Sequence, residues 1–200
     1  LEAVLEGAMA GDPSSQIQDI QKQHYELARA LGLDGPALLE ERLQELEQLV
    51  AGVRLVKEVS VRVRVRVMAL GELMSTRLGA AFLQEQGLPV CWLDARDLMT
   101  SWSQPGGNPI TSYLSATCVY TPDPKLSATL AEQGDVILTQ GFIARNKAGE
   151  TVLLGRGGSD TSAAYFAARL QARRLEIWTD VPGMFTANPK VVPSARLLKS

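Results

Sequence analysis

The chain has 200 residues, 46% of them hydrophobic and 21% charged, which is typical of a globular protein with a substantial core. A formal charge of -2 and a pI near 5.5 provide no basic field for a polyanion, so we expect no nucleic-acid partner. No run reaches the roughly 18 uncharged apolar residues that a membrane span needs, and the acidic first residues differ from a signal peptide. Cys91 and Cys118 lack a CxxC spacing, which indicates reduced thiols and predicts no metal site. We therefore expect a cytoplasmic protein without a membrane partner.

Residues 1–87 are predicted to be mainly helical. Apolar residues recur at spacings of three and four over residues 14–31 and again over 36–50, which predicts two amphipathic helices. Residues 60–67, SVRVRVRV, alternate with period two and by themselves predict a strand with one basic face. His24 is the only histidine, and no acid or nucleophile motif accompanies it, so we expect it to have a surface or packing role.

From residue 88 onward, short apolar runs alternate with helices. Strands are expected at LPVCWLDAR, SATCVYT, DVILTQGFI, TVLLG and LEIWT, and helices at PDPKLSATLAEQG and over residues 159–173. This alternation predicts an α/β fold with a mainly parallel sheet covered on both faces. Such sheets bind ligands at the carboxyl ends of their strands. The loops after Ile143, Leu154 and Trp178 are therefore expected to carry function.

The strongest local signal is the segment 153–164, LLGRGGSDTSAA, in which a strand runs through a glycine-rich turn into a helix. Glycines let backbone N–H groups approach a ligand closely, and the start of a helix favours an anion. Ser159 or Asp160 is positioned to cap that helix, and Arg156 offers a bidentate donor to a carboxylate or phosphate. The glycines alone favour a purely structural turn, but Arg156 and Asp160 around them favour a binding site.

Two weaker signals flank this one. In the segment 177–193, IWTDVPGMFTANPKVVP, a strand is expected to end at Thr179 and Asp180 and to continue as an ordered, proline-punctuated loop at the functional edge of the sheet. A purely structural loop remains the alternative. In ALGELMS, Glu72 interrupts an otherwise apolar helix face, although an acid in such a position is usually just solvated.

Taken together, GRGGSDTSAA, WTDVPGMFTANPKVVP, GELMS and TQGFI resemble the aspartate kinases of the amino acid kinase family. The resemblance implies a three-layer α/β/α sandwich and transfer of the γ-phosphoryl group of ATP to the side-chain carboxylate of L-aspartate. This reaction yields 4-phospho-L-aspartate, the first step toward lysine, threonine and methionine. The resemblance also makes residues 60–67 the start of a long helix that ends near Gly87. GELMSTRLGAAFLQEQG further resembles the kinase half of bifunctional aspartate kinase/diaminopimelate decarboxylase proteins.

The resemblance implies a role for each matching residue. Glu72 would hold the substrate ammonium, and Asp160 matches the family acid near the substrate amino group and the catalytic lysine, so it is the catalytic candidate. The substrate carboxylate would be held by Arg156, Gly157, Gly158 and Ser159. The nucleotide would be contacted by Thr179, Asp180, Phe185 and Lys190. Phe185, Asn188 and Lys190 stand where the family commonly has tyrosine, aspartate and arginine, which puts the geometry of the ATP site in doubt. The implied partners are L-aspartate and ATP, with Mg²⁺ carried by the nucleotide and a homo-oligomer in the full-length protein.

The family also draws positive charge from lysines in a KFGG-type first strand and a GAK-type later segment, and neither segment is present in these residues. Residues 1–200 are therefore expected to be one kinase-domain fragment, incomplete at both ends. It consists of a helical part, 1–87, and an α/β part, 88–200, without a regulatory ACT domain. Alone, it is expected to be inactive. Two alternatives stay open: another phosphotransferase of the amino acid kinase family, and a truncated module that only binds or assembles.

Overall fold

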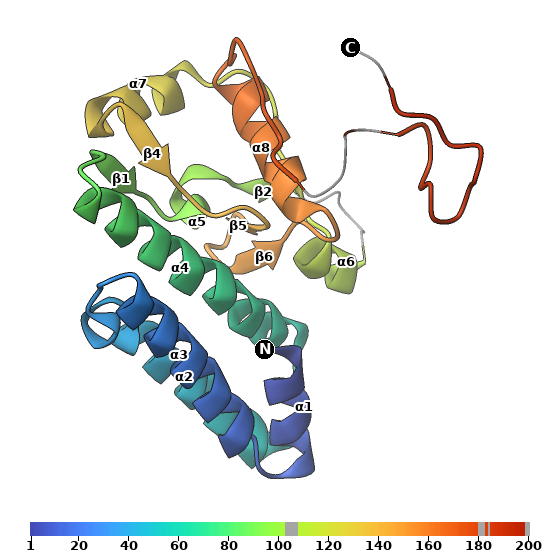
Figure 1. Ribbon diagram of the computed structural model, residues 1–200. Helices are drawn as coiled ribbons and strands as arrows, with labels where there is room; N and C mark the ends of the chain where they lie inside the picture. The colour runs from blue at the N-terminus through green and yellow to red at the C-terminus, as the bar shows by residue number, and fades with distance from the viewer. Residues whose placement is uncertain (103–107, 180–182, 184, 199–200) are drawn as a thin grey trace.

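The computed structural model describes residues 1–102, 108–179, 183 and 185–198. Its elements in chain order are α1 (Glu2–Ala10), α2 (Ser14–Ala30), α3 (Gly35–Val56), α4 (Val61–Glu85), β1 (Val90–Trp92), α5 (Ala95–Leu98), β2 (Ser101–Trp102), α6 (Pro109–Leu114), β3 (Thr117–Cys118), α7 (Pro124–Gln133), β4 (Val136–Leu138), β5 (Ile143–Arg145), β6 (Thr151–Leu153) and α8 (Gly158–Arg169). Figure 1 shows α4 lying between the helices α1 to α3 and the strands.

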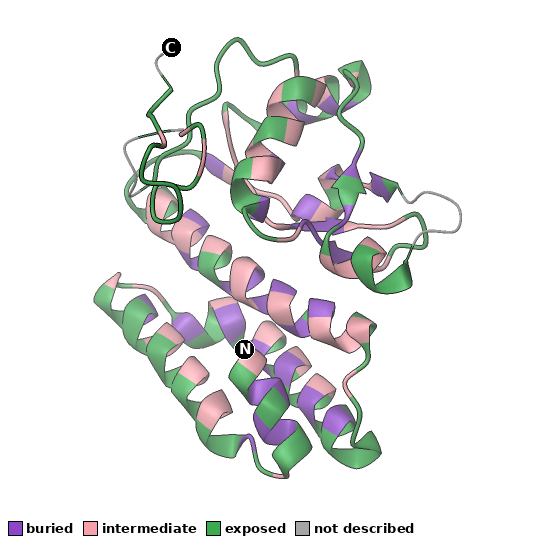
Figure 2. Ribbon diagram, turned by 90° about the vertical axis from the view of Figure 1, so that its right-hand side faces the viewer, coloured by how far each residue is buried: buried purple, intermediate pink, exposed green. Residues whose placement is uncertain are grey.

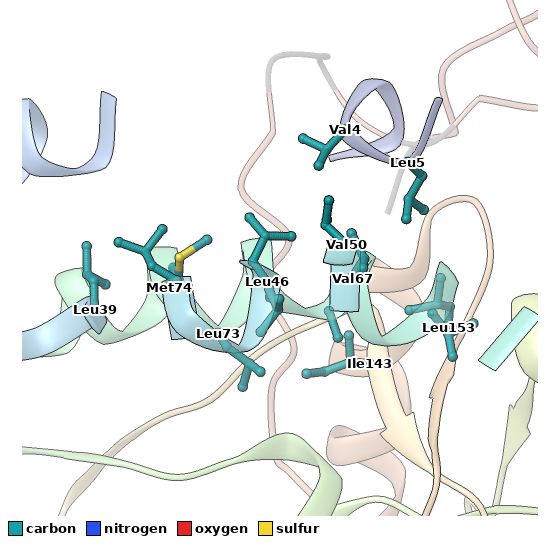
Figure 3. Packing of buried hydrophobic residues seen from close by; sticks show 14 of the residues in the cluster. Val4, Leu5, Leu39, Leu46, Val50, Val67, Leu73, Met74, Ile143 and Leu153 are labelled. Atoms are coloured by element: carbon teal, nitrogen blue, oxygen red, sulfur yellow. The ribbon is translucent and has the colours of Figure 1, made fainter. Parts of the chain in front are cut away.

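Helix α4 is buried from two opposite sides, and this organises the core. Leu39 and Leu46 of α3 pack in one hydrophobic cluster with Leu73 of α4 and with Ile143 and Leu153 of the strands. Figure 3 shows these side chains gathered around the α4 ribbon. The helical and the α/β parts therefore share this cluster, and a second, smaller cluster lies within the α/β part.

The two-sided burial explains why SVRVRVRV forms a helix. Residues two apart in a helix point about 200° away from each other, so alternate valines reach opposite faces, and Val65 and Val67 are both almost fully buried. Ser60 caps the helix by accepting the Val63 N–H at 3.3 Å. The intervening arginines pair with carboxylates on three neighbours: Arg62 with Glu150, Arg64 with Glu2 and Arg66 with Glu45. The strand expected from period two is wrong, and the long helix is confirmed.

The other N-terminal helices agree with the apolar periodicity, with two differences. Helix α2 has the expected bounds, whereas α3 continues past residue 50 because its apolar stripe continues to the buried Val53. The residue that follows its last turn, Lys57, adopts a left-handed backbone conformation. Helix α1 was not predicted, although Val4, Leu5 and Ala8 form its buried face.

The strands form three pairs in the described residues. β1 and β4 are parallel, with Val90 opposite Val136, whereas β2–β3 and β5–β6 are antiparallel. α4 covers one face of the strands, and α7 and α8 lie on the other (Figure 1). This arrangement confirms the α/β class and its parallel strands. The parallel share is smaller than the alternating runs predicted, because residues 146–150 join β5 to β6 by a turn too short for a crossover.

The segment LEIWT differs from expectation. Residues 174–179 form no strand, and Trp178 is 90% exposed. In the described part of the chain, these residues belong to none of the paired strands. Residues 185–198 follow as a mostly exposed loop, which Figure 2 shows in green. None of the described helices is long and apolar enough to cross a membrane.

Candidate active site

The glycine turn lies between β6 and α8. Gly155 and Gly157 have φ values of 76° and 71°, in the left-handed region that favours glycine. A Cβ on Gly155 would also lie 2.9 Å from the Ser115 hydroxyl oxygen, so this residue faces a close neighbour. Helix α8 then begins at Gly158. The strand, turn and helix predicted for this motif are confirmed.

The TQGF turn packs directly against the start of α8. A Cβ on Gly158 would lie 2.6 Å from Phe142 Cδ2 and 3.0 Å from Phe142 Cα. A Cβ on Gly141 would lie 2.7 Å from Ser159 Cα. The Phe142 N–H also donates to Ser162 Oγ at 2.9 Å. Two motifs that are far apart in the sequence thus meet through backbone contacts that leave no room for a side chain.

The side chains around the start of α8 face solvent. Arg156, Ser159 and Asp160 are exposed, and Gly157 is the N-cap residue. The capping role expected of Ser159 or Asp160 is wrong, because both residues lie inside the first turn and no side chain caps the helix. Within the described residues, neither the Arg156 guanidinium nor the Asp160 carboxylate has an ion-pair partner. The first turn of α8 and Arg156 therefore remain available to an anion.

Glu72 lies on α4, with a half-buried side chain. Burial raises the pKa of its carboxyl above the ordinary value. Among the described residues, no cation or hydrogen-bond donor contacts this carboxylate. A half-buried carboxylate without a partner is stabilised in its charged form by any cation that reaches it.

A hydrogen bond links the Glu72 turn of α4 to the TQGF turn. Gln140 is 1% exposed, and its Nε2 donates to Thr76 Oγ1 at 2.9 Å, one helical turn after Glu72. Next to it, Thr139 Oγ1 is buried with no described partner. Sequence reasoning named the TQGFI motif but missed these polar side chains. The signal was a polar pair inside an otherwise apolar strand run.

Two of the expected nucleotide residues, Phe185 and Lys190, belong to the segment 185–198, which lies apart from this cluster (Figure 1). Thr179 is exposed, and Asp180 falls outside the described residues. Phe185 is half-buried and forms an antiparallel bridge with Leu197. Lys190 is exposed, and its backbone N–H donates to Asn188 Oδ1 at 3.0 Å. Figure 1 shows residues 185–198 projecting beyond α8, so the structure does not bring Phe185 and Lys190 to the glycine turn, and their roles stay predictions.

The two cysteines carry no sign of reactivity. Cys118 is fully buried, and burial raises the pKa of its thiol to about 11. Cys91 is half-buried, and both thiols are free.

Comparison with known proteins places the chain in a family. The sequence profile of the Amino acid kinase family matches residues 12–200. The chain is 38% identical over 168 residues to bifunctional aspartokinase/homoserine dehydrogenase 2 of Escherichia coli K12, a match that covers 82% of this chain and 19% of that protein. It is 32% identical over 202 residues to lysine-sensitive aspartokinase 3 of the same organism, covering 98% of this chain and 42% of that protein. The chain thus spans less than half the length of these relatives.

A solved structure agrees with these matches. The crystal structure of E. coli aspartokinase III in complex with aspartate and ADP superposes with a TM-score of 0.78 at 29% identity, over 98% of this chain and 44% of that one. Both the profile, which spans nearly all of the sequence, and the shared arrangement of helices and strands lead to one conclusion: the chain belongs to the amino acid kinase family.

Proposed function

We propose that this chain is part of an aspartate kinase and forms most of its aspartate-binding site. In this proposal the full protein transfers the γ-phosphoryl group of ATP to the side-chain carboxylate of L-aspartate. Family membership and relatives named as aspartokinases support it, as does the neighbouring structure solved with aspartate and ADP.

The observation that carries the proposal is the half-buried carboxylate of Glu72, which has no described cation partner. An α-amino acid brings an ammonium group to such an acid, and the ion pair offsets the cost of burying the charge. A substrate without an ammonium would leave that cost in place. Glu72 therefore favours an amino acid over a simple carboxylate or phosphate.

The start of α8 supplies the complementary charge. The exposed guanidinium of Arg156 and the uncapped first turn of the helix suit the substrate carboxylate, with Gly157, Gly158 and Ser159 providing N–H groups. Asp160 lies on the same helical turn, and we assign it the role of the acid near the substrate amino group. Opposite charges on the two sides of the site would orient one end of the substrate and leave its side chain free to react.

The chemistry needs positioning more than acid–base catalysis. The acceptor carboxylate, with a pKa of about 3.9, is already ionised at neutral pH, so no general base is required. The barrier comes from bringing an anion to a triphosphate, and cationic groups and oriented N–H donors lower it. In the proposal Thr179, Asp180, Phe185 and Lys190 contact the nucleotide. Mg²⁺ arrives with the phosphates and neutralises part of their charge. A cytoplasmic location and a homo-oligomeric state belong to the same proposal.

The test uses the longest protein encoded by the reading frame that contains these 200 residues. Its product is trapped with hydroxylamine, which converts an acyl phosphate into a coloured hydroxamate. L-aspartate is compared with succinate, which has the same two carboxylates but no ammonium. We expect turnover with L-aspartate and at least a hundredfold lower kcat/KM with succinate, on the order of two lost charge-assisted interactions.

Equal use of the two acids would overturn the role of Glu72 and favour another phosphotransferase of the family. The absence of ADP release with L-aspartate would overturn the function itself. The 200-residue chain, assayed beside the longer protein, tests the expectation that these residues alone do not turn over aspartate.

A further inference from the structure

Gln140 makes two hydrogen bonds that connect three elements. Its Oε1 accepts the backbone N–H of Ala95, at the start of α5, at 2.8 Å. Its Nε2 donates to Thr76 Oγ1 on α4 at 2.9 Å. Gln140 itself lies just after β4 and is 1% exposed. A buried amide with these partners is costly to misplace, because water cannot replace either bond.

The Thr76 hydroxyl is fully used by its neighbours. It donates to the backbone carbonyl of Glu72 at 2.7 Å. It accepts from Gln140 Nε2 and, at 3.1 Å, from Trp92 Nε1. A hydroxyl has one hydrogen to give and two lone pairs to receive, so all three capacities are occupied.

This saturation orients the Gln140 side chain. If the amide were rotated by half a turn, its NH₂ group would face the Ala95 N–H, and its oxygen would face a Thr76 hydroxyl whose hydrogen already binds Glu72. Both contacts would then lack a donor–acceptor pair. One orientation of the Gln140 amide therefore satisfies the whole network.

The residues that follow Gln140 reach the other side of the candidate site. Gly141 lies against Ser159, and Phe142 lies against Gly158. Three consecutive residues thus contact the Glu72 turn of α4 and the first turn of α8. The link between the two sides is short and leaves little freedom to either.

We propose that Gln140 is a positioning residue, which acts through Thr76 to hold the Glu72 turn at a set place relative to the start of α8. This inference rests on the proposed function, because it assumes that Glu72 and α8 bind opposite ends of one substrate. Gln140 touches no substrate in this arrangement. Its loss should weaken aspartate binding and leave ATP binding unchanged.

The test breaks the hydrogen-bond network either at Gln140 or at Thr76. Gln140→Met keeps the length of the side chain and removes both hydrogen bonds. Thr76→Val keeps the shape and removes the hydroxyl, whereas Thr76→Ser restores it. Gln84, which is exposed, offers a control on the same helix, since its Nε2 donates to the Val90 carbonyl at 2.7 Å and also joins α4 to a strand. Gln84→Met removes a similar bond about 18 Å further along the helix from Glu72.

In the longest protein of the reading frame, we expect Gln140→Met and Thr76→Val each to raise the aspartate KM about five- to tenfold, with the ATP KM unchanged. Thr76→Ser should return the aspartate KM to within about twofold of the parent value. The double variant should be no worse than the more severe single one, because both changes break one chain of bonds. An unchanged aspartate KM, or equal rises in both KM values, would overturn the inference.

A second readout does not depend on turnover. The carboxyl carbon of Glu72, followed by NMR in the same protein, reports the titration of that side chain. Gln140→Met and Thr76→Val should shift its midpoint, since they move the Glu72 turn in its half-buried setting, and Gln84→Met should not. An unshifted midpoint would overturn the positioning role even in a protein without activity. A shifted midpoint in a parent protein that does not phosphorylate aspartate would support Gln140 as a positioning residue and reject only the proposed function.

Discussion

The two sides of the candidate site are held in place by different means. On the α8 side, Gly141 and Gly158 bring the TQGF turn and the helix into backbone contact. On the α4 side, the Glu72 turn is held by the hydroxyl of Thr76 and the amide of Gln140. The geometry of the α8 side depends on glycines that have no side chain, and the geometry of the α4 side depends on hydrogen bonds between side chains.

The difference predicts how each side fails. A Cβ inserted between two backbones must displace one of them, so the α8 side should tolerate no substitution at its contact glycines. A hydrogen-bond network can lose one member and keep its packing, so the α4 side should weaken by degrees. The effects of substitution should therefore be largest on the α8 side and smallest on the α4 side.

The largest effect is expected from Gly158→Ala. The new methyl group would stand 2.6 Å from Phe142 Cδ2 and 3.0 Å from Phe142 Cα, and the backbone atom cannot swing aside. We expect a loss of about 3 kcal/mol or more in the free energy of unfolding, together with loss of aspartate binding. Urea unfolding followed by circular dichroism measures the first quantity.

Gly79→Ala is the matched control for this experiment. Gly79 lies within α4, and nothing stands within 4 Å of its ideal Cβ position. Alanine favours a helix over glycine by roughly 1 kcal/mol, so this variant should be as stable as the parent or slightly more stable. If Gly158→Ala were as stable as Gly79→Ala, the backbone contact between the two turns would not be tight.

The second effect concerns the charge on the α8 side. Arg156→Ala removes an exposed guanidinium without a described partner, so the fold should lose little. We expect the aspartate KM to rise by a factor of about ten to a hundred and fifty, the equivalent of roughly 1.5 to 3 kcal/mol, with a nearly constant ATP KM. Steady-state kinetics and a melting curve separate the two effects. Arg173, also exposed, provides the control substitution, and a matching rise in Arg173→Ala would contradict a specific role for Arg156.

The contrast between backbone contacts and side-chain hydrogen bonds also explains which features could be predicted from the sequence. The glycines predicted the turn correctly, because Gly155 and Gly157 adopt the left-handed backbone that favours glycine and Gly158 leaves no room for a Cβ beside Phe142. The polar pair Thr139–Gln140 stands out in its apolar run, but nothing local to it could identify Thr76, 64 positions away, as the partner of Gln140. Period two in SVRVRVRV was misleading for another reason, since a helix buried on two opposite faces also needs alternate apolar residues.

For the C-terminal part, the prediction from sequence failed because strand formation there depends on residues elsewhere in the fold. LEIWT has the composition of a strand, yet a strand forms only where it pairs with another, and residues 174–179 belong to no strand pair of the described structure. Phe185 and Lys190 follow this segment, so their relation to the glycine turn depends on the same pairing. The local sequence can indicate that a segment favours the β conformation, but whether it joins a sheet depends on the tertiary structure around it.

The third prediction tests the α4 side by charge alone. Glu72→Gln keeps the shape and an acceptor oxygen but removes the negative charge that would pair with the substrate ammonium. We expect the aspartate KM to rise about five- to thirtyfold, the equivalent of roughly 1 to 2 kcal/mol, and the ATP KM to stay constant. Because this variant keeps a hydrogen-bond acceptor, the effect should be smaller than that of Arg156→Ala. Equal weakening of both substrates, or a large fall in melting temperature, would assign Glu72 to the fold instead.

The smallest effect concerns stability against pH. Burial raises the pKa of Glu72 above its ordinary 4.5, so the folded state holds this proton more tightly than the unfolded state does. The resulting stabilisation is fully present below pH 4.5 and is lost as the pH rises through the folded-state pKa. Glu72→Gln has no proton to lose at this position. Its melting temperature should therefore match that of the parent below pH 4.5 and exceed it slightly near pH 7.

Aspartate should reverse that small difference. An ammonium group bound beside Glu72 favours the charged carboxylate, so substrate binding lowers the pKa of Glu72 and gains strength as the pH rises through it. Saturating L-aspartate at pH 7 should then raise the melting temperature of the parent more than that of Glu72→Gln, whereas succinate should raise both equally. Melting curves at pH 4 and pH 7, with each acid present or absent, give the comparison. If L-aspartate stabilised both proteins equally at pH 7, Glu72 would not contact the ammonium, and the amino-acid specificity would have to come from the α8 side alone.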